Sequence, residues 1–201
     1  MSKPLEGHTT NRLANFFTAP PVPGLLYLSG LGLGVASVIA ATPGNGALAF
    51  GAHALSIAGL YGLFARHRGP GLTGLFAGAL AARVGFAITA ALSLMVASTS
   101  EPALLIAMFA LPAELLCLSF ALGRLCRANG HHKMAKLLGY NAGAFALSDV
   151  LAVGGILALG IIGAERLPWL AEVYIVGLYG LLVTALVYMS ALGYTAIRVR
   201  A

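Results

Sequence analysis

The chain is poor in charged and amide side chains. Only 9% of its 201 residues are charged, against about 25% in a typical soluble domain, and glutamine is absent. Hydrophobic residues make up 59% of the sequence. A chain with so few charges cannot cover a folded surface with polar groups. The composition therefore excludes an ordinary soluble domain and indicates an integral membrane protein.

The sequence also lacks the motifs that carry well-known catalytic chemistry. It has no glycine-rich phosphate loop followed by a lysine, no HExxH metal pair and no nucleophile motif. Catalysis has no support from individual residues, and we predict that the protein is not an enzyme.

Only two cysteines are present, Cys117 and Cys126. On one helix their spacing places them on opposite sides and about 13 Å apart along the axis, too far to pair within the helix. Cys126 could join His131 and His132 as metal ligands, but this spacing matches no zinc pattern, and a solvated basic loop is the preferred interpretation. We predict neither a structural disulfide nor a metal site.

Long apolar runs are what the sequence has in abundance. Each approaches or exceeds the roughly 20 residues that a helix needs to cross about 30 Å of hydrocarbon, and a helix satisfies its own backbone hydrogen bonds in lipid. The predicted fold is an all-α integral membrane protein, a bundle of six transmembrane helices. The six runs are Gly24–Ala41, Ala47–Ala65, Leu72–Ala97, Ala103–Leu125, Ala135–Ile162 and Trp169–Ile197.

The runs are separated by short connections, so we predict one transmembrane domain over residues 24–197. Residues 1–23 form a cytoplasmic segment in which 9–17 has the pattern of a short interfacial amphipathic helix, and residues 198–201 form a cytoplasmic tail. A frayed tail is the alternative for the N-terminal segment. A cleaved signal peptide is the alternative for the first run.

The net charge of +6 is distributed to one side of the predicted bundle. Six spans with the N-terminus inside leave only Arg166 on the outer side, whereas the inner side receives ten basic residues. This positive-inside bias predicts a bacterial-type inner (cytoplasmic) membrane with both termini in the cytoplasm, and the basic character needs no nucleic-acid partner. The ten residues are Lys3, Arg12, Arg66, Arg68, Arg124, Arg127, Lys133, Lys136, Arg198 and Arg200.

Small residues recur at helical spacing in most runs. Since lipid is as apolar as leucine, membrane helices gain association energy from the close backbone approach that small residues permit. We expect the spans to pack tightly with one another or with foreign helices, so the predicted partners are membrane lipids, other membrane-protein subunits or further copies of the chain. The main candidate packing residues are Gly30, Gly34, Gly74, Gly78, Gly177 and Gly180.

Three ionisable residues lie in mid-span, Arg83, Glu114 and Asp149, and helix geometry places them in one layer of the membrane. An isolated charge at the bilayer centre costs at least about 2.5 to 3.5 kcal/mol, so Arg83 is expected to face inward and pair with a carboxylate. Glu114 is the first choice, because a short loop joins the two helices. This pairing leaves Asp149 without a cation.

Two interpretations of this charge cluster stay open. In the structural one, Arg83 and Glu114 fix the helix order, and a neutral Asp149 is hydrogen-bonded to Asn141 or Ser148. In the functional one, Asp149 or Glu114 exchanges protons along an ion path while Arg83 sets the electric field. The scarcity of polar side chains elsewhere in the runs favours the structural interpretation.

His53, in the stretch GAHALS, is a weak candidate ligand. Its imidazole could ligate the metal of a haem or another porphyrin-type pigment, or relay protons, whereas a hydrogen-bonded packing histidine is the preferred interpretation. No cofactor is predicted with certainty. A porphyrin-type pigment and a bound lipid remain the alternatives.

These features favour a noncatalytic multi-pass subunit or scaffold that packs against a larger respiratory, photosynthetic or transport complex. Short loops, small-residue stripes and few polar groups all suit that role. The alternative is a small proton-coupled or pH-gated transporter or channel that uses Arg83, Glu114 and Asp149.

Overall fold

The computed structural model describes residues 19, 22–40, 45–95, 100–163 and 167–198, and all regular structure within these ranges is α-helical. The candidate amphipathic segment 9–17 and the tail residues 199–201 lie outside the described residues. The helices are α2 (Val22–Ala40), α3 (Asn45–Arg66), α4 (Leu72–Met95), α5 (Ser100–Ala128), α6 (His132–Ile162) and α7 (Trp169–Arg198).

Five of the described helices, α3 to α7, are long and apolar enough to cross a membrane. In α2 the continuous stretch with described side chains, Val22–Gly34, is also apolar but shorter. The predicted all-α, multi-pass membrane fold is therefore confirmed at this level. The helix bounds stay within a few residues of the apolar runs, although α5 and α6 extend into the polar connections that bound their runs.

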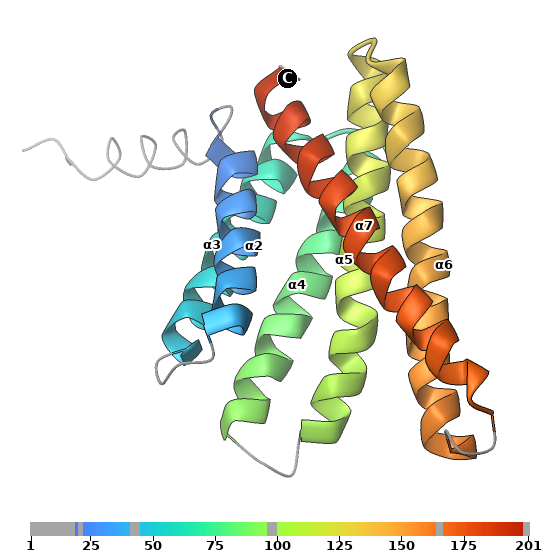
Figure 1. Ribbon diagram of the computed structural model, residues 1–201. Coiled ribbons are helices and arrows are strands. Elements are labelled where there is room, and N and C mark those ends of the chain that lie inside the picture. Colours follow the sequence, from blue (N-terminus) through green and yellow to red (C-terminus); the bar gives the residue numbers. More distant parts are fainter. Residues whose placement is uncertain (1–18, 20–21, 41–44, 96–99, 164–166, 199–201) are drawn as a thin grey trace, which may run out of the picture.

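Successive helices run antiparallel, and the start of α2 and the end of α7 lie at the same end of the bundle (Figure 1). The most extensive contacts join helices that follow each other in the chain, above all the pairs α2 with α3, α6 with α7, and α4 with α5. Helix α7 leans across the bundle and also contacts α5 and α2. Because of this tilt, α7 packs against helices that are distant from it in the sequence.

Basic side chains gather at one end of the bundle. Arg66 ends α3 and Arg68 lies in the turn to α4, and this turn lies at the same end as the turn from α5 to α6 (Figure 1). Gly71, with φ of 76°, packs directly against the Arg124 guanidinium, a position that suits glycine because it tolerates left-handed backbone and has no side chain to displace the arginine. Glu172 lies in the first turn of α7, at the opposite end.

Each described helix contributes at least one fully buried large side chain to a common core, and large apolar side chains also cover the outside. Phe50, Tyr140 and Ile161 are 76%, 77% and 85% exposed, respectively. Such a surface would aggregate in water but is suited to hydrocarbon. The core side chains include Tyr27, Leu60, Phe76, Leu118, Leu138 and Leu192.

Glycines allow the closest helix contacts. A Cβ atom on Gly30 of α2 would lie 2.6 Å from the backbone nitrogen of Ser56 on α3, and one on Gly177 of α7 would lie 2.8 Å from Cα of Ala152 on α6. Gly180 is similarly pressed against α6. No larger residue fits at these positions without moving a helix, so both pairs rely on glycine for their packing.

The other candidate packing glycines contact less. A Cβ on Gly78 would lie 3.1 Å from Sγ of Cys117, and one on Gly34 would meet its nearest neighbour on α3 at 3.8 Å. Gly74 packs against no other described helix of the chain: it is exposed, and a Cβ there would meet no described atom within 4 Å. The reason is its angular position, about 200° around α4 from the buried Phe76.

Candidate functional site

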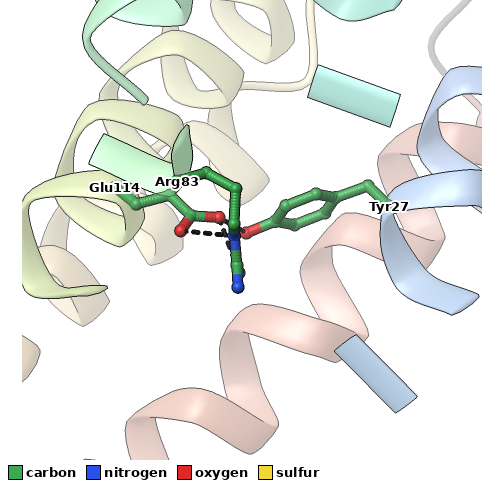
Figure 2. Close-up of polar contacts among 3 residues, drawn as sticks. All are labelled: Tyr27, Arg83 and Glu114. Carbon is green, nitrogen blue, oxygen red and sulfur yellow. Dashed lines mark hydrogen bonds and ion pairs between the residues drawn. The ribbon is translucent and has the colours of Figure 1, made fainter. Parts of the chain in front are cut away.

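Arg83 of α4 and Glu114 of α5 form a buried ion pair. Nη2 of Arg83 donates to Oε1 of Glu114 at 2.9 Å, and Nε lies 2.8 Å from Oε2 in an ion contact without hydrogen-bond alignment (Figure 2). Arg83 is 5% exposed and Glu114 is 0% exposed. The guanidinium therefore lies along both carboxylate oxygens, and this two-point arrangement is one that lysine cannot reproduce.

Tyr27 of α2 joins the same carboxylate. Its hydroxyl donates to Oε1 of Glu114 at 2.5 Å, while the Arg83 Cζ lies 6.0 Å from the tyrosine ring centroid, at the limit of a cation–π contact. Gly59 of α3 makes this placement possible, since a Cβ there would lie 2.5 Å from the Tyr27 nitrogen. One carboxylate thus ties α2, α4 and α5 together (Figure 2). We refer to Tyr27, Arg83 and Glu114 as the buried triad.

Aromatic side chains enclose the triad. The Phe86 ring centroid lies 5.9 Å from Cζ of Arg83. Tyr188 of α7 is 2% exposed and lies in the same buried cluster as Tyr27. In surroundings of such low polarity the two charges attract strongly, and removing either one would leave a buried unpaired charge and destabilise the fold.

His53 of α3 lies next to this enclosure. Its ring meets Phe86 edge-on, with centroids 5.2 Å apart. Its buried Nδ1 has no hydrogen-bond partner among the described residues, and the side chain also lines an alanine-rich groove of about 550 Å³ between α3 and α4. An apolar planar ligand could use this groove, so the pigment and lipid alternatives stay predictions.

Asp149 of α6 lies apart from the buried triad. It is partly buried and forms no ion pair or hydrogen bond with any residue in the described part of the chain. It lines a second groove, of about 470 Å³, together with side chains of α5 and α7. The structure therefore brings Arg83 and Glu114 together and places Asp149 in separate surroundings.

Asn141 and Ser148, the expected partners of Asp149, contact α7 instead. Nδ2 of Asn141 donates to the Thr184 carbonyl at 3.0 Å, and Ser148 packs against Gly180. Asn141 and Ser148 are two turns apart and share one face of α6, whereas Asp149 lies about 100° around the helix from Ser148. Asn141 and Ser148 therefore hold α6 against α7, whereas Asp149 lines the neighbouring groove.

Sequence reasoning missed Tyr27, Phe86 and Tyr188. A tyrosine close to the start of an apolar run looks like an interfacial anchor, which is the commoner role of that residue type. The signal that could have revealed Tyr27 is chemical: a buried carboxylate has about four lone-pair sites, whereas a guanidinium directs only about two N–H groups at one carboxylate, so a further donor is expected.

The chain matches no protein-family model, no curated protein and no solved structure. Within the described ranges, no three histidine, cysteine, aspartate or glutamate side chains are arranged to hold a metal ion. The interpretation of the site rests on its own geometry.

Proposed function

We propose that the chain is a noncatalytic multi-pass membrane subunit or scaffold that packs against a larger membrane complex. The buried triad carries this proposal, because its charges are paired, enclosed and shared among three helices. Neither Arg83 nor Glu114 lines either of the two grooves described above. Charges held in this way serve to specify helix order.

The proposed topology has six spans, with both termini in the cytoplasm of a bacterial-type inner membrane. Helix α2 has 19 residues and is about 28 Å long, close to the thickness of the hydrocarbon core. The clustering of described basic side chains at one end supports the orientation, since positive charge favours the cytoplasmic side.

The proposed partners are lipids and other membrane subunits or further copies of the chain. Helices α6 and α7 offer a broad apolar surface on which Leu147, Val150 and Val183 are 63%, 67% and 58% exposed. An apolar surface of this kind can pack against lipid acyl chains or against the apolar helices of another subunit. A porphyrin-type pigment or a lipid is the candidate occupant of the groove beside His53.

The test is the native mass and absorption spectrum of tagged protein extracted from its own membrane in mild detergent. We expect a mass well above that of one chain, with defined larger subunits in constant ratio, and a lower assembled fraction for Glu114→Gln. The proposal would be overturned by a single colourless chain, or by normal assembly of Glu114→Gln. A porphyrin-type absorption band lost in His53→Ala would assign the pigment.

A small proton-coupled transporter or channel is the second candidate function. The observation that favours it is Asp149, an unpaired carboxylate in an apolar groove. If this function holds, purified protein in liposomes will carry a proton-coupled flux that Asp149→Asn abolishes with the fold intact. Unchanged flux in that variant would remove Asp149 from the mechanism.

A further inference from the structure

The groove that contains Asp149, here called the Asp149 groove, has the size and lining of a small-molecule site. Its volume of about 470 Å³ falls within the roughly 300 to 1,000 Å³ typical of ligand pockets. Its walls are apolar apart from one carboxylate and one phenol. The residues that matter here are Leu111 and Pro112 of α5, Asp149 and Ile156 of α6, and Tyr174 and Leu182 of α7.

The Asp149 carboxyl has no counter-charge within the described residues. Arg83, the cation of the described helix interiors, is already held by Glu114, and no basic side chain lines the groove. A carboxylate in apolar surroundings gains from a cation much more than it would in water. Charge complementarity therefore favours a positively charged ligand in the groove.

The walls of the groove are preformed. A Cβ on Gly155 of α6 would lie 3.0 Å from Cα of Tyr174, so this close contact fixes one edge of α7 against α6. Tyr174 also supplies an aromatic ring, which attracts cations. Pro112 of α5 lines the opposite side of the groove with an apolar ring.

We propose that the Asp149 groove binds a lipophilic organic cation carrying a single positive charge. The charged centre lies beside the Asp149 carboxylate, and the apolar groups lie against the leucine and isoleucine walls. Calcium needs about six to eight oxygen ligands and magnesium a full octahedron, so one carboxylate in an apolar groove is a poor site for either ion. A lipid tail would satisfy the walls but leave the carboxylate unpaired.

This inference goes beyond the scaffold function and does not depend on it. Binding is measured on the full chain alone, whereas the scaffold function is tested by co-purification. Failure of one test therefore leaves the other standing.

The experiment measures equilibrium binding of tetraphenylphosphonium to purified protein in nanodiscs of phosphatidylcholine. We expect saturable binding, weakened at least about tenfold by Asp149→Asn and retained by Asp149→Glu. The matched control is Glu172→Gln, which removes an exposed carboxylate of α7 outside the groove and should bind as the wild type does.

A second variant keeps the test decisive if Asp149→Asn fails to fold. Leu178→Trp narrows the groove without touching the charge and should also weaken binding, whereas Leu186→Trp, on the same helix but outside the groove lining, should not. Circular dichroism and gel filtration establish that each variant is folded. Absence of saturable binding to wild-type protein, or equal binding by folded Asp149→Asn, would overturn the proposal.

Discussion

Glu114 and Asp149 are the same kind of group in opposite circumstances. Both are carboxylates inside long apolar helices, yet Glu114 is 0% exposed and held by Arg83 and Tyr27, whereas Asp149 is partly buried, lines an open groove and has no described partner. The first is fully committed to holding helices together. The second has no described partner and can bind a ligand. This difference distinguishes a structural carboxylate from a candidate ligand-binding carboxylate.

The largest expected effect comes from breaking the buried triad. Glu114→Leu leaves the Arg83 guanidinium buried without a counter-charge, and we expect the free energy of unfolding to fall by about 3 to 5 kcal/mol. The measurement is reversible unfolding in mixed micelles, followed by circular dichroism.

The double variant Arg83→Met with Glu114→Leu is the control, because replacing both charges by apolar groups of similar volume should restore most of the lost stability. A single Glu114→Leu variant as stable as the wild type would show that the pair contributes nothing to folding.

A smaller effect is expected from Tyr27→Phe, which removes only the hydroxyl that donates to Glu114. Hydrogen bonds to charged groups contribute about 1.5 to 3 kcal/mol, so the free energy of unfolding should fall by that amount in the same assay. Tyr140→Phe is the matched control, since it removes the same hydroxyl from a side chain of α6 that is 77% exposed and takes no part in the triad. Equal losses in both variants would contradict the geometry of the triad.

Next in size is the close packing of α7 against α6, two of the helices that line the Asp149 groove. Gly177→Ala would place a methyl group 2.8 Å from Cα of Ala152, and overpacking of this kind costs about 1 to 3 kcal/mol. Thermal unfolding monitored by gel filtration measures the loss. Gly74→Ala is the control: it meets no described atom within 4 Å, so it should be neutral or slightly stabilising, as alanine favours a helix over glycine.

The smallest effect is expected at Asp149. Asp149→Asn removes a charge that has no described partner, so the free energy of unfolding should change by no more than about 0.5 kcal/mol, as for other substitutions away from structural contacts. The same micelle assay compares it with Glu114→Gln. A loss as large as that of Glu114→Gln would erase the distinction between the two carboxylates.

The mid-span charges were predictable because a charged residue is conspicuous in an apolar run. The meeting of Arg83 with Glu114 also follows from a simple constraint, since a short connection makes α4 and α5 neighbours. The position of Asp149 was harder to infer: the expected layer of three charges followed from depth alone, and depth does not define the direction in which each helix face points.

Tyr27 and Gly74 both show that the sequence did not determine which face of a helix points into the bundle. No sequence pattern marked Tyr27, which lies in the triad, and Gly74, one of the candidate packing glycines, is exposed in the single chain. Rotation of a helix about its own axis decides both outcomes. A sequence rich in small residues on several faces does not specify that rotation.

The sequence by itself determined the class of the protein and the approximate bounds of its helices, because hydrocarbon demands long apolar segments that satisfy their own backbone hydrogen bonds. Only the tertiary structure decided which polar groups meet. Close contacts such as Gly59 against the Tyr27 backbone set the rotation and approach of each helix. These contacts pair Glu114 inside the bundle and leave Asp149 in a groove, since burial and pairing depend on neighbours contributed by other helices.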